Sequence, residues 1–170
     1  MPVALSTARL ALQRLDSTHL DIVHSLFADP GHSLSDGPVR DIADTEAWLQ
    51  RRQGTFEGAG FAWYGLWLRT GTFVGTCGLL LSERCAPEPE IGYEIARPMR
   101  GRGLAREAAE AVTEAAHEFG VPRLWATVRT GNQASMRILS SLGYLEEHTE
   151  PDDRGALAYL YSIPDEGPTA

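Results

Sequence analysis

The chain has 170 residues, of which 43% are apolar, and its formal net charge is −8 at pH 7. This length and composition are typical of one globular domain with its own core, and the negative charge argues against nonspecific nucleic-acid binding, which needs a basic face. The apolar runs are too short to span a bilayer and the N-terminus lacks a signal-peptide pattern, so we expect a cytoplasmic protein without a membrane partner.

The first sixty residues predict a strand, a helix, a long loop and a short second helix. A partly alternating run at Ser6–Leu15 indicates the strand. Ser17 or Thr18 caps the next helix, whose apolar residues recur at helical spacing: Leu20, Val23 and Phe27. Turn-forming residues fill Asp29–Asp41, and the second helix follows over Asp44–Gln53.

The middle of the chain predicts three strands, because aromatic and branched residues gather there. Gly60–Arg69 and Thr72–Leu81 form a hairpin through the two residues between them. Pro89–Pro98 is the third strand, and its final proline ends it because proline keeps the preceding residue extended.

The next part of the chain predicts a helix, a strand and another helix. The first helix begins at Leu104 and buries a stripe of apolar residues at helical spacing. The strand covers Leu124–Arg129, and Asn132 caps the second helix, which runs to Leu142. Residues 143–148 and 156–163 then form a final hairpin.

These elements predict an α/β (α+β) fold. The strands Pro89–Pro98 and Leu124–Arg129 are separated by a helix, so a right-handed crossover can place them side by side and parallel. Early and late strands follow one another closely and pair antiparallel. We therefore expect a mixed, mostly antiparallel, twisted sheet with a central parallel pair and helices on both faces, in a single domain over residues 1–163. Residues 164–170 are expected to be a frayed tail.

The two cysteines, Cys77 and Cys85, have neither the number nor the spacing of a disulfide framework or a zinc site. We therefore expect no bound metal. The sequence contains no repeat and no linker, and it is compatible with association into an oligomer.

The turn before the helix at Leu104 carries the segment RGRGLAREA, which starts at Arg100. The first N–H groups of a helix lack internal partners, and the helix dipole places partial positive charge there. Glycines allow successive N–H groups to converge on an anion, and arginines add charge. The segment is therefore either a diphosphate pocket or a tight turn with solvated arginines. It lacks the lysine of a P-loop and the third glycine of a dinucleotide fingerprint.

Three segments resemble the GCN5-related N-acetyltransferases (GNAT family), especially the RimJ/RimL-like branch that acetylates ribosomal-protein N-termini. RGRGLA is similar to the family pattern Arg/Gln-x-x-Gly-x-Gly/Ala, and EIGYEIA precedes it as a strand. TGNQASMRILSSLGY follows and resembles the Asn-x-x-Ser helix of that branch. The likeness extends over nearly the whole chain.

The resemblance implies that the strand Glu90–Arg97 carries a bulge and splays from Leu124–Arg129, and that acetyl-CoA is the co-substrate. Its pantetheine arm enters the gap like an added strand and bonds the backbone at Ile95, Ala96 and Arg97. The implied diphosphate site consists of Arg100, Gly101, Arg102, Gly103, Leu104 and Ala105. Further implied cofactor contacts are Asn132, Ser135 and Arg137, although a solvated Arg137 is an equal alternative.

Amide formation requires an aligned thioester, a neutral amine and a departing thiolate. Glu90 is the candidate base and Glu94 the reserve, because both lie on one face of an extended strand; the alternative is that both are surface charges. The tyrosine that protonates sulfur in many family members corresponds to Leu139, so the resemblance points to Ser135 instead. Alternatively, Ser135 bonds within its helix and the thiolate leaves without an acid.

These features predict an acetyl-CoA-dependent N-acetyltransferase that acts on a primary amine, and the acidic balance suits a cationic one. The resemblance favours a protein N-terminus, with a polyamine, an amino acid or an aminoglycoside as the alternative. A non-catalytic acyl-CoA sensor is the rival from another class of protein. Trp48, Trp63 and Trp67 either line the acceptor pocket or belong to the core.

Overall fold

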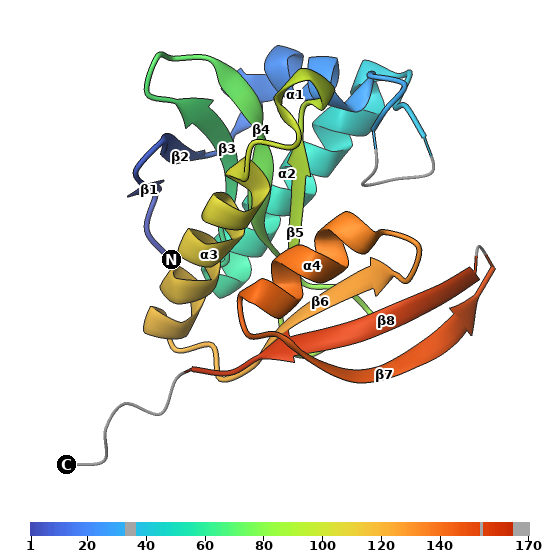
Figure 1. Cartoon of the computed structure of the whole chain (residues 1–170). Helices are drawn as coiled ribbons and strands as arrows, with labels where there is room; N and C mark the ends of the chain where they lie inside the picture. The colour runs from blue at the N-terminus through green and yellow to red at the C-terminus, as the bar shows by residue number, and fades with distance from the viewer. Residues whose placement is uncertain (33–36, 154, 165–170) are drawn as a thin grey trace.

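The structure, a computed structural model, describes residues 1–32, 37–153 and 155–164 (Figure 1). The strands are β1 (Ala4–Ser6), β2 (Leu10–Arg14), β3 (Trp63–Leu68), β4 (Phe73–Leu80), β5 (Glu90–Ile95), β6 (Leu124–Arg129), β7 (Leu145–Asp152) and β8 (Gly155–Ser162). The helices are α1 (Leu20–Phe27), α2 (Ile42–Ala59), α3 (Leu104–Glu118) and α4 (Gln133–Ser141). From residue 165 onward, the expected tail lies outside the described residues.

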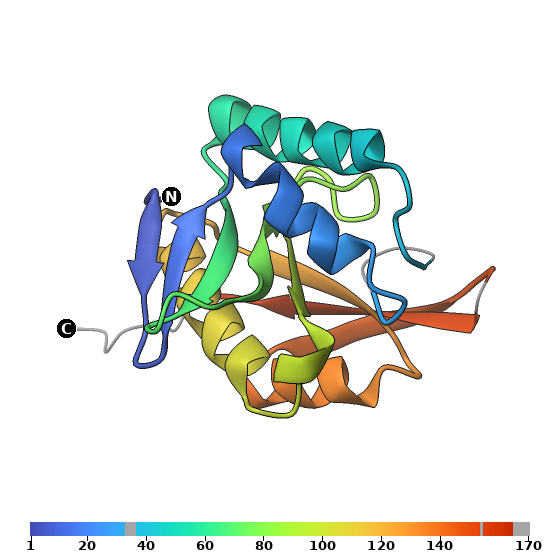
Figure 2. The ribbon, with the colours of Figure 1, turned by 90° about the horizontal axis from the view of Figure 1, so that it is seen from above.

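The strands form one sheet in the order β1-β2-β3-β4-β5-β6-β8-β7. Within the described residues β5 and β6 pair parallel and the other neighbours pair antiparallel. Seen from above, α1 and α2 cover one face of the sheet, and α3 and α4 cover the other (Figure 2). The predicted mixed sheet with helices on both faces is therefore confirmed.

The N-terminal region corrects two predictions. The strand expected over Ser6–Leu15 is a hairpin, because the chain turns where the amide of Thr7 donates to the carbonyl of Leu10 at 2.9 Å, which separates β1 from β2. The helix cap is Asp16 rather than Ser17 or Thr18. Its carboxylate accepts from the Thr18 amide at 2.9 Å and starts a short 3-10 turn that leads into α1.

Helix α2 is longer at both ends than the expected Asp44–Gln53. It begins after Asp41, whose carboxylate accepts from the amide of Ala43, and it continues until Gly60. Gly60 adopts φ of 73°, a left-handed conformation that ends a helix. The expected loop over 29–41 falls partly outside the description, because residues 33–36 are not described.

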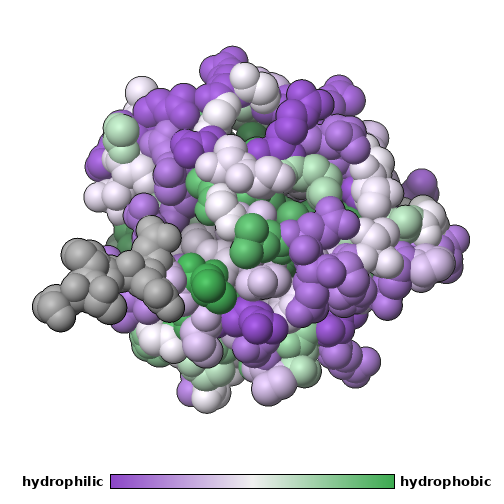
Figure 3. All heavy atoms as spheres, turned by 60° about the horizontal axis from the view of Figure 1, so that its bottom comes forward, coloured by the Kyte–Doolittle hydropathy of each residue, from purple (hydrophilic) through white to green (hydrophobic). Residues whose placement is uncertain are grey.

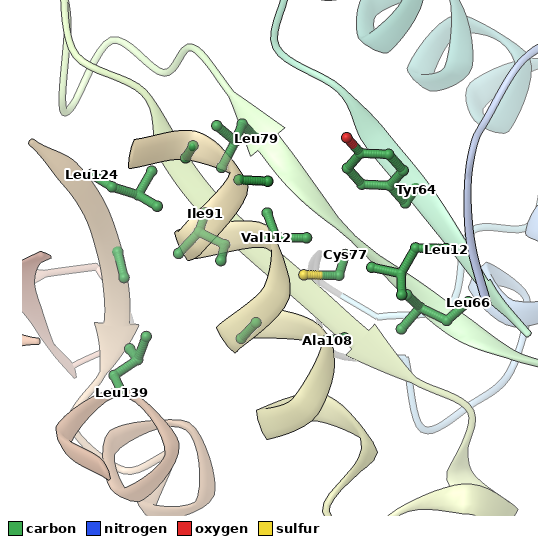
Figure 4. Packing of buried hydrophobic residues seen from close by; sticks show 14 of the residues in the cluster. Leu12, Tyr64, Leu66, Cys77, Leu79, Ile91, Ala108, Val112, Leu124 and Leu139 are labelled. Carbon is green, nitrogen blue, oxygen red and sulfur yellow. The ribbon is translucent and has the colours of Figure 1, made fainter. Parts of the chain in front are cut away.

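The core lies on both faces of the sheet. Helix α3 buries Ala108 and Val112 against β4 and β5, where they meet Cys77 and Ile91 (Figure 4). A second cluster lies beneath α1 and α2 and contains Val23, Leu26, Phe27, Leu49 and Trp63. Hydrophilic residues cover most of the face in Figure 3, with a small group of hydrophobic residues near its centre. Among the described residues, no helix is long and apolar enough to cross a membrane.

Strand β5 pairs with β4 without a register shift from Glu90 to Ile95, so the bulge expected in this strand is absent there. Register shifts occur instead in the β3–β4 and β7–β8 pairs. Without a bulge, residues of β5 alternate strictly between the two faces. Ile91 packs with the α3 cluster, whereas a Cβ on Gly92 would meet Trp63 at 2.7 Å. Glu90 therefore faces the α1–α2 side, and Tyr93 faces the α3–α4 side.

Candidate active site

Strands β5 and β6 separate soon after they meet, which opens the centre of the sheet. Their pairing is limited to Glu90 opposite Trp125, with the amide of Trp125 donating to the carbonyl of Pro89 at 2.9 Å. Beyond this point a cleft of about 530 Å³ lies between them. The splay predicted for these two strands is therefore present.

The backbone of β5 offers unpaired groups to this cleft. The amide of Ala96 donates to the carbonyl of Val74 on β4 at 2.8 Å, so even-numbered residues of β5 bond β4 and odd-numbered residues face β6. Because β6 has separated, the N–H groups of Tyr93 and Ile95 have no strand partner in the described part of the chain. The carbonyl of Ile95 accepts from Arg100 Nε at 2.8 Å.

The carboxylate of Glu90 lies where the two strands separate, and only 8% of the residue is exposed. Oε1 accepts from the amide of Thr127 at 3.2 Å and from the Thr127 hydroxyl. Oε2 accepts from Ser82 Oγ at 2.7 Å and from Cys85 Sγ at 3.8 Å. Four donors, two on Thr127 of β6 and two in the loop between β4 and β5, thus hold the carboxylate at the cleft.

The glycine–arginine turn precedes α3 with two left-handed glycines, Gly101 and Gly103, each with φ of 74°. The first intrahelical bond runs from Glu107 to the carbonyl of Gly103. Among the described residues, no protein acceptor is found for the N–H groups of residues 101 to 105. These five groups at a helix N-terminus can hold an anion.

Arg9 supports this turn from the β1–β2 hairpin. Its Nη1 donates to the carbonyl of Arg102 at 2.7 Å, and its Nε lies 2.5 Å from Glu107 Oε2. The backbone amide of Arg9 and the Thr7 hydroxyl also donate to Glu107. Burial of Glu107 raises its pKa, but these hydrogen bonds outweigh that effect and the net pKa is lowered. The sequence does not indicate this support, because the hairpin and the turn are far apart in the chain.

The similarity of this chain to known proteins agrees with this geometry. The family described as "Acetyltransferase (GNAT) domain" matches residues 9–145, which is most of the chain. This chain belongs to the GNAT acetyltransferase family. The chain is 31% identical over 148 residues to the uncharacterized protein YkkB of Bacillus subtilis (strain 168), covering 82% of this chain and 83% of that one.

Two solved structures show how widely this GNAT fold is shared. The ribosomal L7/L12 alpha-N-protein acetyltransferase RimL in complex with coenzyme A has a TM-score of 0.82 at 19% identity, with 98% of each chain covered. A spermidine N-acetyltransferase chimera from Vibrio cholerae and hSSAT has a TM-score of 0.76 at 15% identity, with 92% of this chain and 96% of that one covered. At these identities the likeness shows the fold.

The α1–α2 side of the GNAT cleft is aromatic and cationic. Trp48 and Trp63 line it, whereas Trp67 packs against Phe73 outside it. Arg52 of α2 also lines the cleft, with its guanidinium 5.1 Å from the ring of Trp48 and 4.9 Å from that of Trp63. Sequence reasoning missed Arg52, although its position four residues after Trp48 is a helical spacing that favours such a contact.

The α3–α4 side of the cleft contains Tyr93, Ser135 and Leu139. Leu139 is fully buried and provides no proton donor. Burial raises the pKa of the Tyr93 hydroxyl to about 12, and this hydroxyl has no hydrogen-bond partner in the described part of the chain. Sequence reasoning missed Tyr93, although the alternation of EIGYEI places it opposite Glu90.

Other predicted site residues have partners within the protein. Glu94 does not line the cleft; its carboxylate lies 2.8 Å from His32 Nδ1 and 3.1 Å from Arg100 Nη2. Arg100 also donates to the carbonyl of Gly31 at 2.7 Å and therefore connects β5 to the segment after α1. Arg97 is exposed and lies just before the glycine–arginine turn.

Helix α4 begins beside the cleft. The side chain of Asn132 accepts from the amide of Ser135 at 3.2 Å, as expected of a helix cap, and both residues line the cleft. Arg137 is exposed, outside the cleft lining, and donates to the carbonyl of Gln133 at 3.1 Å.

A larger hollow of about 730 Å³ lies beside α1 and the start of α2 and shares Trp48 with the cleft. Its described lining includes Arg40, Asp41, Asp44 and Arg51. We place the chemistry in the cleft, because the cleft combines the open backbone of β5, the fixed carboxylate of Glu90 and access from both faces of the sheet.

Proposed function

We propose that this GNAT enzyme transfers the acetyl group of acetyl-CoA directly to a primary amine in a ternary complex, and that the acceptor is a protein N-terminal amine. The observation that carries the proposal is the unpaired backbone of β5. This backbone faces a cleft that has Glu90 on one side. Beyond Ile95 the chain continues to the free amides of residues 101–105.

Coenzyme A fits the α3–α4 side. The free amides at the start of α3 suit its diphosphate, because oriented N–H groups and the helix dipole both favour an anion. The pantetheine arm then follows β5 and bonds the N–H groups of Tyr93 and Ile95 as an added strand does. Ala96 and the side chain of Arg100 already bond the protein, so we assign them a positioning role.

The acceptor fits the α1–α2 side, which Trp48, Trp63 and Glu90 line. The thioester would lie in the gap between the strands, so the amine and coenzyme A approach from opposite faces of the sheet. The amine nitrogen attacks the thioester carbon, a bound water passes the proton from nitrogen to Glu90, and the carbon–sulfur bond breaks. Holding both reactants in line supplies much of the acceleration.

Tyr93 is the candidate donor to the departing sulfur, and Ser135 lines the same side of the cleft. A hydroxyl with a pKa of about 12 stays protonated at neutral pH and can protonate the thiolate. The proton that Glu90 accepted then replaces the one that Tyr93 gave up. The products are therefore an amide and the free thiol of coenzyme A.

Tyr93→Phe is expected to lower kcat by about tenfold and to leave the Kd for acetyl-CoA within about twofold. The effect is modest because a thiolate leaves readily at a thiol pKa of about 8.5. Steady-state rates between about pH 6 and about pH 9 test this, and the profile should keep its shape because Tyr93 does not titrate there. An unchanged kcat would show that the thiolate departs unassisted.

The function itself is tested by thiol release from acetyl-CoA across a panel of peptides and small amines. We expect turnover with unblocked peptides and none with the same peptides acetylated at the N-terminus. Acetyl-CoA should also raise the Tm in the absence of acceptor, because a ligand that binds only the native state stabilises it. Stabilisation without thiol release from any amine would support the acyl-CoA sensor instead. Turnover with small amines alone would support the small-molecule alternative.

A further inference from the structure

Arg52 is a cation in the cleft that lacks a matching anion. Its side chain lies over Trp48 and Trp63, and its Nε is buried without a hydrogen-bond acceptor in the described part of the chain. No carboxylate within the described residues forms an ion pair with it. A buried N–H donor without a hydrogen-bond partner is costly, so such an arrangement suits a site that a ligand completes.

Trp63 provides a second orphan donor at the same place. Its indole Nε1 is buried and has no acceptor in the described part of the chain, and only 3% of the residue is exposed. Buried N–H groups are paired in most proteins. Two unpaired donors on adjoining side chains of one cleft therefore point to a missing acceptor group.

The charge of Arg52 persists at neutral pH. Burial and the neighbouring charge of Arg51 lower its pKa and the carboxylate of Glu90 raises it, which gives a pKa of about 10. Glu90 does not neutralise it by contact, because the carboxylate already accepts from Ser82, Cys85 and Thr127.

The charged lining of the cleft is mainly positive. Its described residues include the arginines Arg52, Arg84 and Arg129 and a single carboxylate, that of Glu90. Arg129 is paired with Asp152 at 2.6 Å, which leaves the partly buried Arg52 and the exposed Arg84 as the cleft cations without an ion pair among the described residues. The charged residues that line the cleft are thus more positive than the chain as a whole, whose net charge is −8. A polycationic amine is disfavoured here, although the overall composition suits one.

We propose that the acceptor carries a carboxylate close to its reacting amine, and that this carboxylate binds Arg52 and Trp63. The inference rests on the proposed function and narrows its substrate class. The amine then lies toward Glu90, and the carboxylate accepts from the buried N–H groups, where charge-assisted hydrogen bonds are strong. The carboxylate can come from an acidic side chain next to a peptide N-terminus or from the α-carboxyl group of a free amino acid.

Matched acceptors distinguish these sources. Thiol release is compared for two peptides that begin Ala-Glu and Ala-Gln, for free alanine and alaninamide, and for spermidine. We expect kcat/KM to be about tenfold or more higher for the carboxylate-bearing member of one pair, and spermidine to be the poorest acceptor. A preference within the peptide pair assigns the carboxylate to a side chain, whereas one within the alanine pair assigns it to a free amino acid. Equal rates within both pairs would overturn the proposal.

Variants connect the preference to Arg52. Arg52→Gln should remove the preference by slowing the carboxylate-bearing acceptor alone, and Arg52→Lys should restore part of it, because a lysine keeps the charge without the planar fork. Arg51→Gln is the matched control, since it removes an exposed cation from the adjacent position of α2 and should leave the preference intact. A similar loss of rate for both members of a pair in Arg52→Gln would contradict the proposal and indicate disturbed packing of the tryptophans.

A binding measurement separates this inference from the transferase proposal. Trp48 and Trp63 flank the site, so their fluorescence reports occupancy. The N-acetylated Ala-Glu peptide should bind about tenfold more tightly than its Ala-Gln counterpart, and Arg52→Gln should abolish the difference. This result would support the carboxylate site even if no acceptor released thiol. Two results together would reject the carboxylate site even if acetyl transfer occurred. These are equal binding of the two peptides and equal rates for alanine and alaninamide.

Discussion

Replacing Glu90 with glutamine is expected to lower kcat by about 100-fold or more at neutral pH, while the Kd for acetyl-CoA stays within about twofold. A positioned base contributes roughly 100-fold to 10,000-fold to proton transfer, and glutamine cannot accept the proton. Acetyl-CoA affinity should be preserved because, in the proposed ternary complex, the coenzyme approaches from the opposite face of the sheet. Single-turnover rates and calorimetric titration with acetyl-CoA measure the two quantities separately.

The Glu90→Gln variant is expected to fold. The amide of Thr127 can still donate to the remaining side-chain oxygen, and the hydroxyl of Ser82 can rotate to accept from the new NH₂ group. A Tm within a few degrees of the wild type would verify this. Glu94→Gln is the contrasting variant, because Glu94 contacts His32 and Arg100 rather than the cleft. It should lower the Tm and leave kcat nearly unchanged.

The opposite pattern, with the rate lost in Glu94→Gln and kept in Glu90→Gln, would move the base to Glu94. An unchanged rate in both variants would show that the amine needs no carboxylate on β5. The pair of substitutions therefore tests the assignment of the base independently of the fold.

The second large effect is expected at the glycine–arginine turn before α3, the proposed diphosphate site. Gly101→Ala should weaken acetyl-CoA binding by about tenfold, because Gly101 has φ of 74° and a side chain disfavours that conformation by about 1–2 kcal/mol. The free protein can relax this strain by rotating the turn, which turns the amides away from one another. Binding of the diphosphate must then restore the strained conformation, and the affinity falls by that amount.

Gly120→Ala is the matched control for this prediction. Gly120 also has a positive φ, of 100°, and an added Cβ at either glycine meets no atom within 4 Å. Gly120 follows the opposite end of α3, so Gly120→Ala should lower the stability and keep the affinity for acetyl-CoA, while Gly101→Ala alone should lose affinity. Equal affinities in the two variants would remove the diphosphate from this turn.

The sequence predicts the elements of this fold well where the signal is local. The stripe of apolar residues in α3 and the Asn132 cap of α4 depend on neighbours within one or two helical turns, and both are found as expected. Errors occur at element boundaries, such as the cap at Asp16 and the extension of α2 to Ala59. The first depends on which of several competing polar side chains accepts from a backbone N–H, and the second on Gly60, where the left-handed backbone ends the helix.

The candidate site was predicted less completely. Glu90 and Ser135 line the cleft as expected of site residues, but Arg52 and Tyr93 were missed and Glu94 lies outside it. Arg52 and Glu90 belong to different layers of the fold, and their proximity results from the packing of α2 onto the sheet. No periodicity within either segment encodes that contact.

The amino-acid sequence by itself determined two features. One is the turn with free N–H groups at the start of α3, and the other is the alternation that places Glu90 and Tyr93 on opposite faces of one strand. Both are consequences of local backbone geometry. The tertiary structure alone decided which charges are available to a ligand. Contacts over long stretches of sequence pair Arg100 with Glu94 and Gly31, direct Arg9 to Glu107, and leave Arg52 without an anion between two tryptophans.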